Sequence, residues 1–211
     1  ESAAQIRAYL RLVPNDTQNR VLLGNLYESM QQYGRALSEY MTAYQLTQSA
    51  PDCMNVARAA LLNGSFALGN RYLTVYLARN EDPDGSVHYL RGASFLGKED
   101  YAAAQADMLE ALALGYPDAA DCYVQLTLCT YMQGDYPNTL YYGGRAEALW
   151  EAPNAECLQR MGLSAMQLGG YEASVGYLRR SLDTDPALTD NHYYIATGCL
   201  LSGDYEGARS A

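Results

Sequence analysis

Apolar and small residues recur three and four positions apart along most of the chain, which is the spacing of a buried helix face. One stretch with this spacing contains Leu23, Gly24 and Tyr27, and the stretch that follows contains Ala36 and Tyr40. The same alternation of two periodic stretches continues to the C-terminal end of the chain. The pattern therefore predicts a series of helix pairs, each of them a hairpin.

A tripeptide that ends in an aromatic residue separates the two helices predicted for each pair. It reads Gly-Asp-Tyr at 134–136 and 203–205 and Gly-Gly-Tyr at 169–171, with weaker copies at 64–66 and 99–101. We expect the glycine to end the first helix in a left-handed conformation and the aspartate to cap the second. Self-similarity with a period near 34 residues is typical of a stacked helical array.

The tripeptide also divides the chain into repeats. With its aromatic residue as position 17, repeats start near residues 17, 50, 85, 120, 155 and 189. We expect residues 1–211 to form a single array, with residues 1–16 as a partial second helix and with a truncated last repeat. Because solenoids normally close with a polar capping element, we also expect this chain to be a segment of a longer protein.

The residue types at fixed repeat positions resemble those of the tetratricopeptide repeat family. Leu-Gly stands at positions 7 and 8, Tyr at 11, Ala at 20, a large apolar residue at 24, Ala at 27 and Pro near 32. Repeat one supplies Leu23, Gly24, Tyr27, Ala36, Tyr40 and Ala43. Small or polar residues replace the expected ones at Gly69, Thr139, Gly143 and Ser174. The resemblance implies an all-α fold, a right-handed superhelical solenoid of antiparallel helix hairpins.

The resemblance also implies a concave groove lined by the first helix of each hairpin, where a peptide segment or a partner helix would bind. After repeat one the groove positions become apolar and aromatic. The expected groove residues are Met54, Arg58, Leu61, Tyr89, Leu96, Val124, Leu128, Tyr131, Met132, Leu163, Met166 and Tyr193. An acidic edge is expected at Asp121, Glu156 and Asp190, where carboxylates either favour the helix dipole or steer a basic partner.

Three occupants of such an apolar face stay open: a ligand segment, a flanking helix of the same protein, or another copy of the chain. The leading functional prediction is a non-catalytic protein-protein interaction scaffold. One alternative is a structural or self-assembling segment whose groove is filled by its own flanking regions or by a second copy. The other is the regulatory part of a larger multidomain protein.

The charge of the chain narrows the class of partner. The formal net charge is −10; residues 1–80 carry +2 and residues 81–211 carry −12. Such a balance repels phosphate backbones and anionic lipids. We therefore expect a protein or peptide partner with basic or apolar character, and neither nucleic acid nor direct membrane contact.

Catalytic chemistry has little support in the sequence, and we predict no enzyme, cofactor or metal site. Both histidines, His88 and His192, fall at repeat position 4, where packing residues are expected. No phosphate-binding Gly-x-x-x-x-Gly-Lys loop accompanies the single lysine, Lys98. The cysteines are expected to be small buried hydrophobes at Cys53, Cys122, Cys129, Cys157 and Cys199.

The compartment stays open at this point. No run of apolar residues is long enough for a membrane span, and no charged-then-apolar signal segment opens the chain. Unpaired cysteines favour a reducing compartment such as the cytoplasm for a soluble protein. Since the chain begins at Glu1, removal of a targeting or anchor segment is not excluded.

Overall fold

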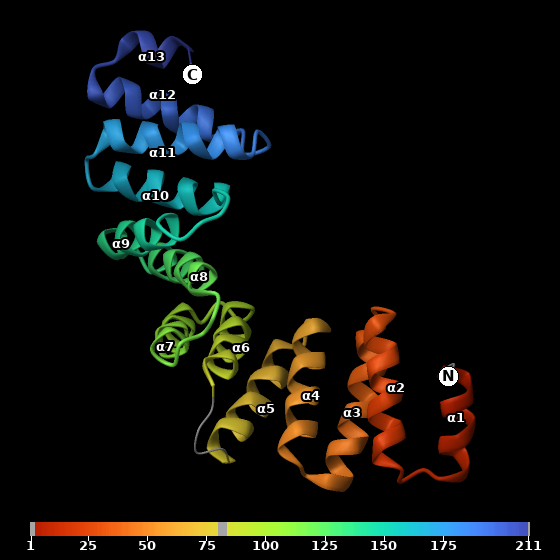
Figure 1. Ribbon diagram of the computed structural model, residues 1–211. Helices are drawn as coiled ribbons and strands as arrows, with labels where there is room; N and C mark the ends of the chain where they lie inside the picture. Colours follow the sequence, from red (N-terminus) through yellow and green to blue (C-terminus); the bar gives the residue numbers. More distant parts are fainter. Residues whose placement is uncertain (1–2, 80–83, 211) are drawn as a thin grey trace. The chain divides into compact units, whose positions relative to one another are not determined.

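The computed structural model describes residues 3–79 and 84–210, and within these ranges it contains helices and no strands (Figure 1). The predicted all-α fold is therefore confirmed. The helices are α1 (Ala3–Leu12), α2 (Thr17–Ser29), α3 (Tyr33–Thr47), α4 (Ala50–Leu62), α5 (Phe66–Arg79), α6 (Gly85–Leu96), α7 (Tyr101–Ala113), α8 (Ala119–Met132), α9 (Tyr136–Glu147), α10 (Ala155–Gln167), α11 (Tyr171–Thr184), α12 (Asp190–Ser202) and α13 (Tyr205–Ser210).

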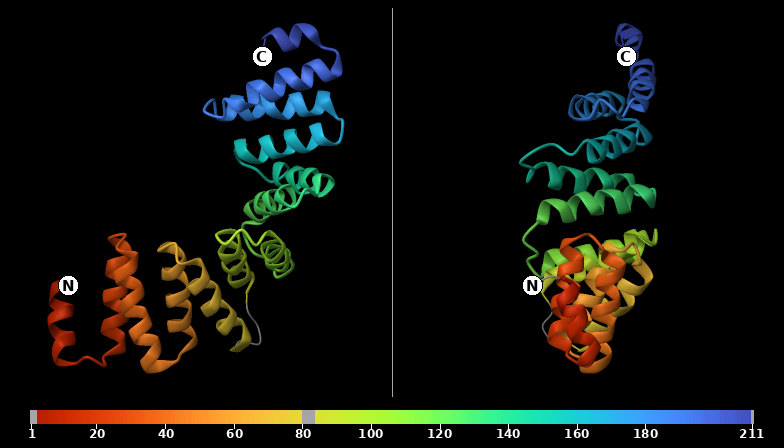
Figure 2. Two further views of the ribbon diagram at one scale, coloured as in Figure 1. Left: turned by 180° about the vertical axis from the view of Figure 1, so that it is seen from behind. Right: turned by 90° about the vertical axis from the view of Figure 1, so that its right-hand side faces the viewer.

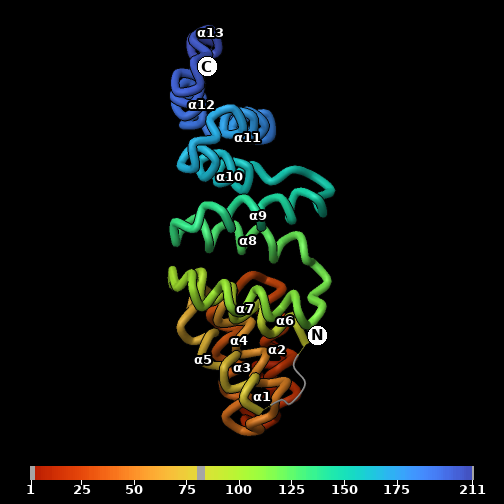
Figure 3. Tube along the Cα trace, turned by 90° about the vertical axis from the view of Figure 1, so that its left-hand side faces the viewer, coloured from red at the N-terminus to blue at the C-terminus, as the bar shows by residue number. Residues whose placement is uncertain are grey.

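The chain divides into two compact units, residues 1–100 and residues 101–211. In the first unit, each helix from α1 to α6 packs against the next, so that α2 to α5 lie side by side as hairpins (Figure 2). In the second unit, the same nearest-neighbour packing runs from α7 to α13 (Figure 3). Within each unit, a helix therefore buries its apolar stripe against its neighbours along the chain.

Helix starts follow the repeat phase that the sequence suggests. The first helices of the hairpins begin at residues 17, 50, 85, 119, 155 and 190. The second helices begin at the aromatic residue of the tripeptide, namely Tyr33, Phe66, Tyr101, Tyr136, Tyr171 and Tyr205. The assignment of residues 1–211 to one continuous array stays a prediction.

The turns within the hairpins use the chemistry expected of the tripeptide. Gly64, Gly134, Gly169 and Gly203 have φ between +72° and +84°, the left-handed region that glycine tolerates best. Asp135 caps α9 by accepting a hydrogen bond from the backbone N–H of Asn138 at 3.3 Å. The turn at Gly134 and Asp135 thus satisfies backbone groups at the end of α8 and the start of α9.

Two turns place a residue with a side chain in the same left-handed conformation, Gln31 at φ +57° and Glu99 at φ +60°. A side chain at this position strains the backbone by about 1 kcal/mol relative to glycine. We expect Gln31→Gly to raise the free energy of unfolding in urea by about 0.5–1 kcal/mol. The reverse change, Gly64→Ala, should lower it, and a Gln31→Gly variant less stable than wild type would contradict the assignment.

Glycine also permits the close crossing of the two helices in some hairpins. A Cβ atom added to Gly24 would lie 2.5 Å from Cε1 of Tyr40, and one added to Gly162 would lie 2.7 Å from Cγ of Leu178. Both large partners are fully buried, with 0% of their surface exposed. A small residue on the first helix therefore makes room for a large one on the second.

Candidate functional site

In the first unit, the face formed by first helices of hairpins carries a polar network. The Tyr40 hydroxyl lies within hydrogen-bond distance of two acceptors, Asn25 Oδ1 (2.6 Å) and Glu28 Oε2 (2.9 Å), and it shares its one proton between them. Glu28 in turn forms an ion pair with Arg58, at 3.1 Å between Oε1 and Nε. Burial first, and then Glu28, raise the pKa of Tyr40 from 10.0 to about 12. The network therefore joins α2, α3 and α4 with Tyr40 in its protonated form at neutral pH.

A hollow opens beside this network, lined among others by Asn25, Ser29, Arg58 and Leu62. Arg58 is the expected groove residue that borders it, and it is already paired to Glu28. Glu28, on the preceding repeat, stands at a groove position of the repeat phase, but its pairing with Arg58 was not predicted from the sequence. The pairing has no local signal in the sequence, since Glu28 and Arg58 stand thirty residues apart and meet only when the hairpins that contain α2 and α4 pack together.

Two apolar groove residues of the first unit serve in packing. Met54 and Leu61 are half-buried and lie against the core residues Ala57, Leu73 and Val87. Tyr89 and Leu96 on α6 are also half-buried. Most of the expected apolar groove residues in this unit are therefore partly buried within the fold, which leaves less of their surface for a ligand.

In the second unit, the first helices of three successive hairpins contribute neighbouring side chains. The Tyr131 ring lies 6.4 Å from the Tyr136 ring. Burial raises the pKa of Tyr131, as do the Tyr136 and Tyr194 hydroxyls, while Arg160 lowers it. These side chains come from α8, α10 and α12, and α10 packs against both α8 and α12.

The expected groove residues of this unit differ in how much they are exposed. Met132 is 50% exposed and Tyr193 is 71% exposed. Tyr131 and Leu128 are half-buried, as are three that pack against core clusters: Val124, Leu163 and Met166. The accessible apolar surface on this face therefore gathers at the C-terminal end of α8 and on α12.

The three carboxylates of the expected acidic edge each lie in the first turn of a helix, α8, α10 or α12. Asp121 accepts a hydrogen bond from Gln125 Nε2 (3.2 Å), and Glu156 pairs with Arg160 at 2.7 Å. Asp190 is exposed. This placement favours the helix dipole and leaves Asp190 open to a basic partner.

The histidines and cysteines differ in how they fit the packing expectation. His88 is half-buried, but His192 is exposed and borders a hollow with Leu182 and Ile195, so the expectation of a buried packing residue is wrong for His192. All five cysteines are free and buried. Burial raises the pKa of Cys122 and Cys129 to about 12 and of Cys157 to about 11, so these thiols hold their protons at neutral pH.

Within residues 3–79 and 84–210, no three His, Cys, Asp or Glu side chains gather closely enough to hold a metal ion. Among the helices that the structure describes, none combines the length and the apolar character needed to cross a bilayer.

The match to a family model covers one repeat, whereas similar solved structures cover most of the chain. Residues 17–49 match the family model described as "Tetratricopeptide repeat". No curated protein matches the chain.

Similar solved structures include YrrB, described as "a TPR protein with an unusual peptide-binding site", with a TM-score of 0.73 and 16% identity over 91% of this chain and 98% of that one. MamA from Desulfovibrio magneticus RS-1 has a TM-score of 0.67 and 19% identity, over 76% of this chain and 89% of that one. PilW, a type IV pilus biogenesis factor, has a TM-score of 0.69 and 16% identity, over 92% of this chain and 89% of that one.

Tetratricopeptide repeat proteins are generally non-catalytic scaffolds that bind proteins or peptides. The matched segment coincides with the hairpin of α2 and α3, and the described helices fit about six such repeats. Residues 17–49 thus match one tetratricopeptide repeat, and the chain has the fold of the tetratricopeptide repeat solenoids.

Proposed function

We propose that this protein is a non-catalytic interaction scaffold that binds an extended or helical peptide segment on the first-helix face of its second unit. The observation that supports this most directly is the exposure of large apolar side chains there. Met132 on α8 and Tyr193 on α12 are at least half exposed, and Tyr131 is half-buried. Tyrosine and methionine offer much contact area, and tyrosine loses little conformational entropy on binding.

The charge of the second unit favours a partner segment with basic flanks. Residues 101–211 contain fourteen Asp or Glu against five Arg and no Lys. Two of these arginines, Arg160 and Arg180, are already paired with Glu156 and Glu147. A basic segment would be attracted, whereas nucleic acid or an anionic membrane would be repelled.

The test is to select binding peptides from a random display library with the whole chain as bait, and then to measure the affinity of the best peptide. The double change Tyr131→Ser with Met132→Ser should weaken binding about 100-fold, since it removes two apolar anchors. A matched double change on second helices, Leu109→Ser with Tyr141→Ser, removes side chains of 40% and 57% exposure. It should leave the affinity within about twofold.

Unfolding curves of both double variants must match wild type for this comparison to hold. Equal loss of affinity in both double variants, or unchanged affinity after the Tyr131 and Met132 changes, would overturn the site.

Self-association is the second candidate, and exposed apolar residues on α12 favour it. Leu200 and Leu201 are each 54% exposed, close in sequence to Tyr193. Sedimentation velocity separates the two functions. A peptide-binding module stays monomeric without ligand, whereas a mass that rises with concentration and falls after Tyr193→Ser would mean that a second copy fills this face.

A further inference from the structure

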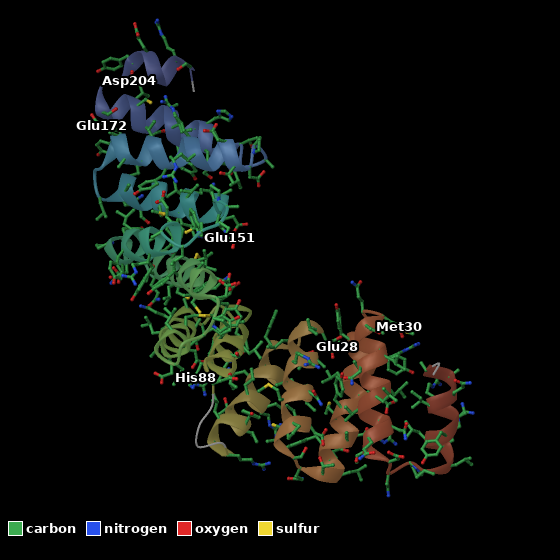
Figure 4. All side chains as sticks on the ribbon, viewed as in Figure 1. Glu28, Met30, His88, Glu151, Glu172 and Asp204 are labelled. Atoms are coloured by element: carbon green, nitrogen blue, oxygen red, sulfur yellow. The ribbon has the colours of Figure 1, made fainter. Side chains whose placement is uncertain are left out.

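A hollow of about 620 Å³ lies in the second unit, and its lining includes neither Tyr131, Met132 nor Tyr193 of the proposed peptide-binding face. Residues 117–120, which lead into α8, form one wall, and residues 149–151, which follow α9, form the other. The loop at 148–154 carries Trp150, the single tryptophan of the chain. Figure 4 shows Glu151 on the right-hand edge of the second unit and Glu172, in the first turn of α11, on its left-hand edge.

Trp150 presents carbon surface to its surroundings from a fixed position. Part of the indole packs against Ala146, Cys157 and Met161, and the residue remains half-buried. Its Nε1 is closed to solvent, so the accessible part of the ring is the carbon skeleton. A ring held in this way loses little conformational freedom when a ligand packs on it. The face of an indole attracts cations more strongly than those of the other aromatic side chains.

The charged groups that line the hollow are both carboxylates. Asp118 and Glu151 border it, and no arginine, lysine or histidine does. Within the part of the chain that the structure describes, neither carboxylate takes part in an ion pair. The Asp118 side chain caps α8 by accepting from the backbone N–H of Asp121 at 3.0 Å. This bond leaves a carboxylate the capacity for further donors.

The electrostatic field near α8 is negative despite the partial positive charge of the helix start. Burial, and then Asp121 and Asp118, raise the pKa of Cys122; burial, then Cys122, and then Asp118 and Asp121 raise the pKa of Tyr116. Two full negative charges thus outweigh the half charge of a helix N-terminus. A cation that enters from solvent meets a favourable field.

We propose that this hollow binds an arginine side chain of a basic partner polypeptide. The planar guanidinium would stack on Trp150 and donate hydrogen bonds to Glu151 and Asp118. Its methylene stem would cover Leu149 and Pro117. Arginine suits the site better than lysine because its planar group can stack and bind a carboxylate through two N–H groups at once.

The test uses Trp150 as its own reporter, because no other tryptophan contributes to the fluorescence. The whole chain is titrated with acetyl-Gly-Arg-Gly-amide and, as the uncharged match, with the same peptide that contains citrulline. We expect a saturable change in emission, half complete at about millimolar peptide, as befits one side chain. The citrulline peptide should give no saturable change in emission, and a peptide with lysine in place of arginine should bind more weakly. Added NaCl should weaken the binding of the arginine peptide.

Variants then locate the site. Glu151→Gln and Asp118→Asn remove charge, and asparagine preserves the helix cap. Each should weaken arginine binding about threefold and the pair about tenfold, while Glu172→Gln, on the opposite edge, should leave it unchanged.

A response to citrulline equal to that of arginine, or unchanged affinity in the double variant, would overturn the proposal. The Tyr131→Ser with Met132→Ser variant should keep the arginine response. Failure of the proposed peptide-binding face therefore remains distinct from failure of this hollow.

Discussion

Gly24→Val is expected to lower the free energy of unfolding by about 3 kcal/mol, because it forces two methyl groups into the crossing of α2 and α3. The Cβ atom alone would lie 2.5 Å from Tyr40 Cε1. Tyr40 cannot move aside at low cost, since it is 0% exposed and its hydroxyl contacts Asn25 and Glu28. Part of the loss would come from this hydroxyl network if the ring were displaced.

The measurement is urea unfolding followed by circular dichroism. Gly144→Val is the matched control: Gly144 is also inside a helix, but an added Cβ atom there meets nothing within 4 Å. It should leave the stability within about 0.5 kcal/mol of wild type. A Gly24→Val variant as stable as the control would mean that the close crossing of α2 and α3 is wrong.

Leu178→Ala is expected to cost about 2–5 kcal/mol, because the removed side chain is 0% exposed and packs with Val175, Ile195 and Cys199. The same measurement on Leu200→Ala, whose leucine is 54% exposed, should show a change of about 0.5 kcal/mol or less. Leu178→Ala also tests the crossing of α10 and α11.

At that crossing, a Cβ atom on Gly162 would lie 2.7 Å from Leu178 Cγ. Gly162→Ala should therefore be less destabilising in the Leu178→Ala background than in wild type, by about 1 kcal/mol in a double-mutant cycle. Additive effects of the two changes would show that Leu178 does not set the requirement for glycine at 162.

Much of the fold could be predicted because its information is local. The helical spacing of apolar residues, the glycine that ends one helix and the aromatic residue that begins the next all act within a few residues of the chain. Asp135, for example, meets its hydrogen-bond donor only three residues away. Small residues such as Gly24 marked the helix crossings, since repetition of the period tells which position faces the partner helix.

The candidate sites were less predictable because they depend on distances that the repeat phase does not specify. Their positions along the helices suggested that Met54, Leu163 and Met166 would face a groove. Each of them is instead partly buried and packs against a core cluster. The repeat phase places Glu28 at a groove position, but it does not reveal that this carboxylate pairs with Arg58. Trp150 lies in a loop, to which helical periodicity assigns no facing direction.

By itself, the sequence determined the helical hairpins, their turns and the acidic balance of the chain, since backbone conformation and net charge follow from residue type and short-range order. Only the tertiary structure decided how exposed Met132 and Tyr193 are, and which residues join Asp118 and Glu151 around Trp150. The physical reason is that exposure and electrostatic field at a point sum over side chains from several helices. Those side chains become neighbours only when the helices stack.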